Sequence, residues 1–470
     1  MGIGDSKLLM IGAEDPHLVR GGLNRYFAAL ADARRQAGVD FDLLWMNAQR
    51  RPIAASPSDT ALRKVAAFGI AARRHPASVI EVHMPLYGLV PMTTRRRVNR
   101  TMFFHGPWAQ EVAMATRAGA VSTGVRRRLA GHLYRRADHC FTASEAFANL
   151  LVDEAGVHPG RVTHVGAGVD LERFTVRDSQ RRPSGGALHV FAVRRLTPRM
   201  GLETLIEAWA AFGPGPADTL RIAGEGELKA ELTNLAARLG VARSVALIGG
   251  VTDDELAREY RSADISVVPT LSLEGFGLVA LESLASGTPV IVTAVDALKE
   301  HVGREWPQLM VEPGSAEALA RLLSGIRDNA MELPSPPRCR AFAERFTWHV
   351  VAENIDSVHE RATTAPARLG VAMSCERHAS AVEDFVSAAV GSGSTDAGLV
   401  LVQSEPSADR VFGFASVSVE RFLWPDQLWR RCGRARPTIV WACEHFARRQ
   451  RLRVPAAEAI QIDNEKRRRA

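Results

Sequence analysis

Cysteine is scarce in this sequence of 470 residues, and its few cysteines form no pattern. They are odd in number, scattered and without metal-ligand spacing. Such usage argues against a disulfide framework and against a zinc site, and it favours a reducing compartment with free thiols. The five positions are Cys140, Cys339, Cys375, Cys432 and Cys443.

A secretory leader and long apolar runs are also lacking. The sequence enters directly into the apolar segment 8–11, and no charged-then-apolar segment precedes it. No run approaches the roughly 20 apolar residues that a membrane-spanning helix needs. We therefore expect a cytoplasmic protein, and we leave open a peripheral position at the inner face of the membrane.

Basic residues outnumber acidic residues, which gives a formal net charge of +7. Much of the excess is arginine, in clusters at 95–97, 126–128 and 135–136. Such clusters suit phosphates or an anionic lipid surface, and an ordinary solvated surface is the other explanation. No nucleic-acid-binding module is recognisable, so a nucleic-acid partner is not expected.

Short apolar runs alternate with helical patterns over most of the sequence, which indicates an α/β fold with parallel sheets covered on both faces. A polar stretch near 175–186 separates two such alternations. We predict two doubly wound, Rossmann-like domains, 1–183 and 184–362, and a further region at 363–470. The predicted strands are 8–11, 41–45, 79–83, 101–105, 139–142, 161–165, 188–193, 219–223, 245–248, 265–268, 289–293 and 309–311.

Candidate binding residues follow these predicted strands. In open α/β sheets, ligands bind outside the carboxyl ends of the strands. The loops at such ends contain Gly21 and Gly22, His105, Arg195 and Glu274. Two domains that face each other across a cleft would bring these loops together.

The stretch from Glu274 to Glu282 is the most specific pattern. Two carboxylates eight positions apart bracket Gly275, Gly277 and an apolar run, and Ser286-Gly-Thr-Pro289 follows. The pattern predicts a helix, a glycine stop and a buried strand, with backbone N–H groups at the helix N-terminus. Such a spot suits a ligand with one anionic and one hydroxyl-rich half, and a nucleotide sugar is such a ligand.

Residues 1 to about 360 resemble a family 4 glycosyltransferase, a retaining enzyme of the GT-B fold. The resemblance runs through several motifs in the order of the family, which makes it more specific than any single motif. The motifs are Arg20-Gly-Gly-Leu23, Phe103-Phe-His-Gly-Pro-Trp-Ala109, Ala143-Ser-Glu145, Gly166-Ala-Gly-Val-Asp-Leu-Glu-Arg-Phe174, Val193-Arg-Arg-Leu-Thr-Pro-Arg-Met-Gly201 and Tyr260-Arg-Ser-Ala-Asp264.

The resemblance implies a donor site around the glutamate pair. Glu274 would contact the donor sugar, and Glu282 would contact the nucleotide ribose. The backbone of Phe276, Gly277 and Leu278 would offer amides to the sugar and phosphate. A nucleotide sugar is thus the expected donor, and it is moved to a hydroxyl acceptor that the sequence does not identify.

Three further contacts follow from the same resemblance. His105 would touch the donor sugar or the reacting centre, and Arg195 would clamp the donor diphosphate, because its planar fork suits phosphate. Gly21 and Gly22, which lack Cβ atoms, would let the ligand approach a helix N-terminus.

One position departs from the family pattern. The family has a lysine where this sequence has Met200, five residues after Arg195. Arg199 is the neighbouring cation that would replace it, and Arg194 is the other candidate. The departure also supports an alternative function, a sugar-nucleotide-binding module with weakened or lost transfer activity.

No metal or other cofactor is expected, because arginines and helix N-termini can stabilise a leaving diphosphate. Asp40-Phe-Asp42 enters a predicted strand, whereas a metal-binding Asp-x-Asp follows one. The resemblance implies front-face attack in which the leaving phosphate assists deprotonation of the acceptor, so no protein base is named. A Rossmann-type oxidoreductase or epimerase is discounted, since Gly-x-Gly-x-x-Gly does not follow the first strand.

The region 363–470 stays unassigned. A linker-like stretch at 363–370 precedes a helical pattern at 378–389 and strand-like runs at 398–402 and 411–417. This order weakly resembles the start of a GNAT-type N-acetyltransferase, although the acyl-CoA loop of that family is not evident. Partner docking and a decayed domain are equal alternatives.

Overall fold

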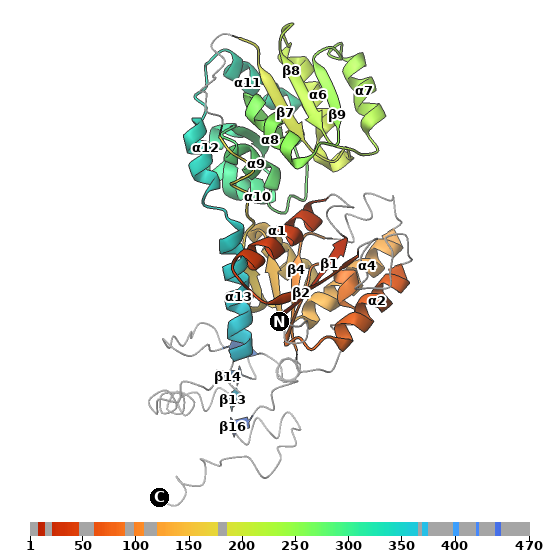
Figure 1. Ribbon diagram of the computed structural model, residues 1–470, viewed down its shortest axis with the longest axis vertical. Helices are drawn as coiled ribbons and strands as arrows, with labels where there is room; N and C mark the ends of the chain where they lie inside the picture. Colours follow the sequence, from red (N-terminus) through yellow and green to blue (C-terminus); the bar gives the residue numbers. More distant parts are fainter. Residues whose placement is uncertain are drawn as a thin grey trace, which may run out of the picture. The chain divides into compact units, whose positions relative to one another are not determined.

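The computed structural model describes residues 8–14, 21–46, 61–89, 98–107, 120–176, 186–364, 369–374, 398–403, 420–422 and 438–442. The chain divides into two compact units, Met1–Val358 and His359–Ala470. The first unit contains two six-stranded sheets. We call residues 8–176 the first lobe and residues 186–347 the second lobe (Figure 1).

The first lobe is built on a parallel sheet with the strand order β2-β1-β3-β4-β5-β6. Both faces are buried, because neighbouring residues such as Leu9 and Met10 enter different core clusters. The strands are β1 (Leu8–Glu14), β2 (Phe41–Met46), β3 (Val79–Val82), β4 (Asn99–Phe104), β5 (His139–Thr142) and β6 (Val162–His164). The helices are α1 (Gly22–Gln36), α2 (Ala61–Arg74), α4 (Ala120–Arg136) and α5 (Glu145–Ala155), with short turns η1 (Pro85–Gly88) and η3 (Pro159–Arg161).

The second lobe has the order β12-β11-β10-β7-β8-β9, again parallel throughout. The strands are β7 (His189–Val193), β8 (Thr219–Ala223), β9 (Val245–Gly249), β10 (Ile265–Val268), β11 (Val290–Thr293) and β12 (Met310–Val311). The helices are α6 (Leu202–Phe212), α7 (Lys229–Arg238), α8 (Asp253–Ser262), α9 (Leu278–Ala285), α10 (Asp296–Leu298), α11 (Ala316–Arg327) and α12 (Pro336–Ala343), with short turns η4 (Pro198–Met200), η5 (Lys299–Gly303) and η6 (Pro307–Leu309).

The predicted α/β fold class is confirmed, and every predicted strand of these two lobes is present within three residues of its expected ends. The strand order reverses between β1 and β3 in the first sheet and between β7 and β10 in the second. Ligands of open α/β sheets bind outside the carboxyl ends of the strands at such reversals. The residues that follow β1, β3, β7 and β10 are therefore the first place to look for a site.

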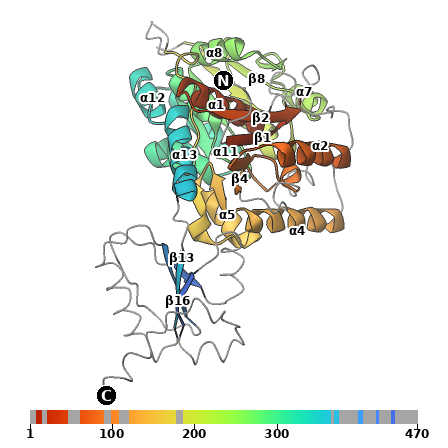
Figure 2. The ribbon, with the colours of Figure 1, turned by 60° about the horizontal axis from the view of Figure 1, so that its bottom comes forward.

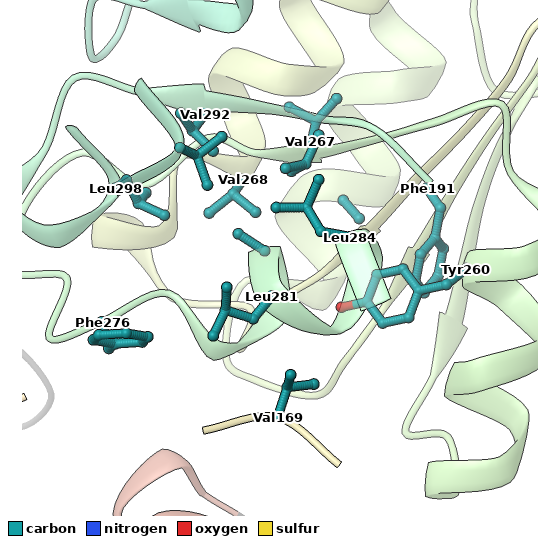
Figure 3. Close-up of a cluster of buried hydrophobic side chains, with 14 of the residues drawn as sticks. Val169, Phe191, Tyr260, Val267, Val268, Phe276, Leu281, Leu284, Val292 and Leu298 are labelled. Atoms are coloured by element: carbon teal, nitrogen blue, oxygen red, sulfur yellow. The ribbon is translucent and has the colours of Figure 1, made fainter. Parts of the chain in front are cut away.

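A buried apolar cluster fixes α9 against the second sheet. Figure 3 shows Leu281 and Leu284 of α9 beside Val267 and Val268 of β10, and all four are buried. Each such leucine contributes about 1.5–3 kcal/mol through its burial. Gly277, at φ 84°, precedes the first residue of α9. This packing determines where Glu274, before α9, and Glu282, within α9, can lie.

The last helix of the first unit, α13 (Trp348–Thr364), packs against the first lobe although it follows the second in sequence. The ring of Trp348 meets Tyr26 edge-on at 4.8 Å, and Asp356 forms an ion pair of 2.6 Å with Arg34. Figures 1 and 2 both show α13 beside α1. The sequence analysis did not predict this return.

The described part of the second unit is a parallel four-stranded sheet with the order β15-β14-β13-β16. Its strands are β13 (Leu369–Ser374), β14 (Gly398–Gln403), β15 (Glu420–Phe422) and β16 (Thr438–Ala442). The predicted strand 398–402 is confirmed, whereas the predicted helix 378–389 and strand 411–417 lie outside the described residues. Parallel neighbours need crossover connections, as in the two larger sheets.

Among the described residues, no helix is long and apolar enough to cross a membrane. Cys140 and Cys339 are buried free thiols, and burial raises the pKa of each to about 12. Cys375, Cys432 and Cys443 lie outside the described residues.

Candidate active site

At the reversal of the second sheet, Arg194 and Glu274 form an ion pair. Arg194 follows β7, and its Nη2 lies 2.7 Å from Glu274 Oε2 and 2.7 Å from Thr270 Oγ1. Thr270 in turn donates to Glu274 Oε2 at 3.1 Å. The Arg194 side chain is only 8% exposed, and its Nε has no partner among the described residues. A buried guanidinium with a free donor beside a carboxylate is suited to bind an additional anion.

The loop that carries Glu274 is held in a strained conformation. Leu273 and Asp296 both have positive φ angles, 60° and 37°. Asp296 accepts a hydrogen bond of 2.9 Å from the Glu274 backbone N–H, and Arg199 donates to the Leu273 carbonyl at 2.8 Å. Non-glycine residues in this region cost about 1–3 kcal/mol each and cluster at functional sites.

Glu282, on α9, is a buried carboxylate with two partners. Its Oε1 lies 2.7 Å from Nη2 of Arg25 on α1, and the Tyr260 hydroxyl lies 3.4 Å from its Oε2. Burial raises the pKa of the Glu282 carboxyl, and the positive charge of Arg25 opposes that shift. The pair joins the two lobes at the N-terminal end of α1.

At the reversal of the first sheet, two histidines are hydrogen-bonded to each other. His83 follows β3 and His105 follows β4, and His83 Nδ1 lies 3.0 Å from His105 Nε2. The His105 ring stacks on Phe103 at 4.4 Å and meets Tyr26 edge-on at 5.1 Å. Burial lowers the pKa of His105 well below its ordinary value, with a smaller contribution from His83. His105 is therefore neutral at physiological pH.

The Glu274 loop lies against the His105 backbone. A Cβ atom added at Gly275 would lie 3.5 Å from the His105 carbonyl oxygen and 3.1 Å from the Phe147 ring. In a second contact between the lobes, Glu300 accepts hydrogen bonds from the backbone N–H groups of Glu145 and Ala146. The structure thus brings together the loops that contain the two predicted catalytic residues.

The predicted glycines open onto free space. Gly21 precedes the first residue of α1 and Gly22 is that residue, and an added Cβ at either would meet no described atom within 4 Å. This leaves room at the helix N-terminus, where backbone N–H groups favour anions. Gly277, by contrast, has no such room, because its added Cβ would lie 2.5 Å from Leu298.

The predicted cations differ in their surroundings. Arg195 is exposed, whereas Arg199 binds the backbone carbonyls of Ser272 and Leu273. Met200 is 5% exposed and belongs to the apolar core. The buried side chain that reaches Glu274 comes from Arg194.

The remaining predicted residues frame α9. Phe276 is buried, with its ring 4.5 Å from His301, and Leu278 begins α9. Within the described ranges, no group of three or more His, Cys, Asp or Glu residues is arranged to hold a metal ion.

Sequence reasoning missed several partners of these residues. It did not single out Arg25, Thr270 or Asp296, which contact Glu282 and Glu274. Arg25 had one available signal, since it lies one helical turn after the glycine pair and so near the expected helix N-terminus. Thr270 and Asp296 had no such signal in the sequence, because single polar residues after strands are common.

Comparisons with known proteins identify the family. The sequence matches the family descriptions "Glycosyltransferase Family 4" over residues 20–173 and "Glycosyl transferases group 1" over residues 175–345. It is 30% identical over 399 residues to the D-inositol 3-phosphate glycosyltransferase of Acidothermus cellulolyticus, covering 74% of this chain and 88% of that protein. It is also 30% identical over 233 residues to the MMP α-(1→4)-mannosyltransferase of Mycolicibacterium hassiacum, covering 48% and 55% of the two chains.

Solved structures show the same fold. Sucrose-phosphate synthase from Thermosynechococcus elongatus superposes with a TM-score of 0.63 at 21% identity, covering 77% of this chain and all of that one. The Anabaena protein HepE, solved with UDP and glucose, superposes with a TM-score of 0.58 at 17% identity, covering 76% and 100%. The chain belongs to the family 4 glycosyltransferases and has the GT-B fold.

Proposed function

We propose that the protein is a retaining glycosyltransferase that moves a sugar from a nucleotide-sugar donor to a hydroxyl acceptor. The observation that carries the proposal is the buried Arg194–Glu274 pair at the strand-order reversal of the second sheet. The pair combines a cation for phosphate with a carboxylate for sugar hydroxyls. HepE, which shares the fold, was solved with UDP and glucose.

The donor phosphates would lie between Arg194 and the N-terminus of α1. The Arg194 guanidinium supplies positive charge, with its Nε buried, and the N-terminus of α1 at Gly21 and Gly22 supplies further positive charge from its backbone N–H groups. Arg195, which is exposed next to Arg194, adds a second guanidinium. Two guanidinium groups stabilise the negative charge that develops on a leaving diphosphate.

The two glutamates would hold the hydroxyl-bearing ends of the donor. Glu274 accepts from sugar hydroxyls beside His105, and Glu282 accepts from the vicinal hydroxyls of the ribose. The backbone N–H groups of Leu278 and Val279, in the first turn of α9, would face the donor between the two carboxylates. The N–H of Ala280 already donates to the Gly277 carbonyl. The buried ring of Phe276 fixes this turn.

The transfer proceeds on one face of the sugar. The bond between the anomeric carbon and the diphosphate oxygen breaks while the acceptor oxygen bonds to that carbon from the same side. The acceptor proton passes to the leaving phosphate oxygen, so neither a protein base nor a metal is required. Arg194 stabilises the phosphate, and Glu274 and His105 hold the sugar in the reactive orientation.

A weakened binding module is the alternative, and Met200 is its support. Met200 is uncharged and buried in the apolar core, so its side chain supplies neither a cation nor a contact to the donor. Arg194 already lies at the site through its contact with Glu274. The proposal therefore assigns the missing charge to Arg194, and it expects full transfer activity.

A hydrolysis and binding screen of UDP-, GDP-, ADP- and dTDP-sugars tests the proposal. We expect slow release of one nucleoside diphosphate, lost in Glu274→Gln and Arg194→Ala. The matched controls are Glu259→Gln and Arg221→Ala, because these residues form a similar Arg–Glu pair of 2.7 Å on the same lobe. Binding of no nucleotide sugar, or equal losses in the controls, would contradict the proposal.

We take the first lobe as the side that faces the acceptor, and it carries a basic surface that fits an anionic membrane. Helix α4 contains arginines at 126–128 and 135–136 and no acidic residue. Val125 is 61% exposed on the same helix, and slight burial and then Arg136 and Arg135 lower the pKa of His132. We propose that α4 docks on anionic lipid and that the acceptor is lipid-linked.

Vesicle sedimentation at low and moderate salt tests the membrane contact. We expect binding to anionic and not to neutral vesicles, with loss at moderate salt because surface charges are then screened. Arg128→Glu with Arg136→Glu should abolish it. The control variant, Arg238→Glu with Arg243→Glu, changes the net charge equally at exposed positions of the second lobe and should keep vesicle binding. Failure to bind anionic vesicles at low salt would exclude it.

A further inference from the structure

A buried polar chain extends from His105 into the first lobe. His83 Nε2 lies 2.7 Å from Glu81 Oε1, and the Arg34 guanidinium binds both Glu81 oxygens at 3.0 Å. Arg34 also pairs with Asp356 on α13. The side chains of Glu81, His83 and Arg34 are fully buried. Nothing in the proposed reaction uses these three residues directly.

The chain determines which ring nitrogens carry protons. Glu81, paired with Arg34, is a carboxylate and can only accept, so His83 Nε2 donates to it. If His83 carries that one proton only, its Nδ1 is an acceptor, and His105 Nε2 donates to it over 3.0 Å. Since His105 is neutral, its second nitrogen, Nδ1, carries no proton. His105 therefore offers an acceptor, and not a donor, to any group beside it.

The aromatic surroundings hold both rings in this arrangement. Phe103 stacks on the His83 ring at 5.3 Å and on the His105 ring at 4.4 Å, and Phe27 meets His83 edge-on at 4.9 Å. The ionisable groups that face the two histidine rings are Glu81 on β3, Tyr26 and Arg34 on α1 and, through Arg34, Asp356 on α13.

We infer that Glu81 and His83 are positioning residues that fix His105 as a hydrogen-bond acceptor for a hydroxyl of the donor sugar. The inference rests on the proposed function, because it assumes that His105 touches the donor. A hydroxyl donates to Nδ1 of His105, whereas a fluorine or hydrogen in its place does not. Glu81 and His83 thereby influence which donor sugar binds, although neither side chain touches the donor.

Two amide variants separate positioning from packing. His83→Asn places its amide near the Nδ1 position and keeps a partner for His105. His83→Gln places its amide near the Nε2 position and keeps a partner for Glu81 only. Both variants remove the ring and bury one amide, so a purely structural role predicts similar losses. We expect His83→Gln to lower kcat about ten- to a hundred-fold, the usual effect of losing such an orienting partner, and His83→Asn to recover most of it.

The assay uses the full chain and whichever of UDP-, GDP-, ADP- and dTDP-sugars it turns over. In a His105→Ala background, His83→Gln should cause no further loss of kcat, because His83 acts through His105. In ¹⁵N-histidine-labelled wild-type protein, the His105 resonances should show a proton on Nε2 and none on Nδ1. This readout needs no donor.

The outcomes distinguish this inference from the proposed function. If His105→Ala keeps wild-type kcat, the role proposed for His105 is wrong and the inference fails with it. If His105→Ala loses activity while His83→Gln does not, only the inference fails. Equal losses in His83→Gln and His83→Asn, or a proton on Nδ1 of wild-type His105, would also overturn it.

Discussion

Arg25 and Glu282 form an ion pair of 2.7 Å that connects the first helix of the first lobe to the buried glutamate of the second. The Glu282 side chain is 6% exposed, whereas that of Arg25 is 34% exposed. A buried carboxylate loses hydration and needs a partner. Arg25 supplies it across the lobe boundary, so the ribose-binding carboxylate of the proposed donor site depends on a residue from the opposite lobe.

Loss of Arg25 should destabilise the protein and alter donor binding. We expect Arg25→Ala to lower the free energy of unfolding by about 1–3 kcal/mol, because it leaves a buried carboxylate unpaired. The pKa of Glu282 should rise further, since the charge of Arg25 opposes the effect of burial. Donor affinity should then weaken as the pH falls and Glu282 is protonated. Chemical denaturation and donor titration at several pH values measure both effects.

A double variant isolates the ion pair. Arg25→Ala with Glu282→Gln should be more stable than Arg25→Ala alone, because no unpaired charge remains. Additive destabilisation would show that the two side chains do not depend on each other.

The two adjacent arginines should have separable kinetic effects. Arg195→Ala should mainly raise KM for the donor, because Arg195 is exposed and, in the proposed site, acts on the donor directly. Arg194→Ala should also lower kcat, because Arg194 holds Glu274 at 2.7 Å. Steady-state kinetics on the donor found in the screen provide the comparison. The same change in both parameters for both variants would refute the distinction.

Two glycines with the same backbone conformation should respond differently to alanine. Gly201 and Gly213 have φ angles of 70° and 68°. An added Cβ at Gly201 would lie 1.9 Å from the Pro269 carbonyl oxygen, whereas at Gly213 it would meet nothing within 4 Å. We expect Gly213→Ala to cost about 1 kcal/mol from backbone strain alone.

Gly201→Ala should cost at least about 2 kcal/mol more, because backbone must move to accommodate it. Denaturation midpoints measure the difference. Activity should fall as well, since Pro269 directly follows β10, the strand that leads to Glu274. Equal midpoints for the two variants would mean that the contact with Pro269 is readily relieved.

Stability should decrease in mild acid because of His301. Burial, and then the charges of His164 and Arg345, lower the pKa of His301 to about 4 in the folded protein. An unfolded histidine has a pKa of about 6.5, so the unfolded state binds a proton first as the pH falls. The contribution of His301 to the stability of the folded state is complete above about pH 6.5 and is lost as the pH falls towards 4.

Between pH 7.5 and pH 5, this histidine should account for about 1–2 kcal/mol of lost stability. Thermal unfolding at both pH values measures the loss. The His301 ring lies beside Phe276 and Phe346, so a phenylalanine should fit there, and His301→Phe should reduce the loss of stability. His349 is exposed, and His349→Gln should leave the loss unchanged. An unchanged loss in His301→Phe would contradict the assignment. The lowered pKa of His105 acts in the same direction.

The sequence alone predicted much of the fold, because buried parallel strands form short, bounded apolar runs. The runs 188–193 and 265–268 are examples, and both become strands next to each other. The glutamate pair was also predictable, since Glu274, Glu282 and the glycines between them are close in sequence. Local spacing carries such information directly.

The partners of these residues were not predictable from spacing. Arg25 and Glu282 lie in different lobes, and Arg194 meets Glu274 only because β7 and β10 are neighbours. Glu81 and His83 lie two positions apart in one strand and its extension, a pattern common to many sheets. Their link to His105 depends on the register of β3 and β4, which the sequence does not reveal.

The return of α13 to the first lobe limits how the protein can be divided. A fragment that ended at residue 183 would lack Trp348 and Asp356, which cover Tyr26 and pair with Arg34. Arg34 would then have one carboxylate partner in place of two, and part of the surface of α1 would lose its cover. Exchange of the first lobe between relatives, whether in evolution or by engineering, must therefore transfer this distant helix together with the N-terminal residues.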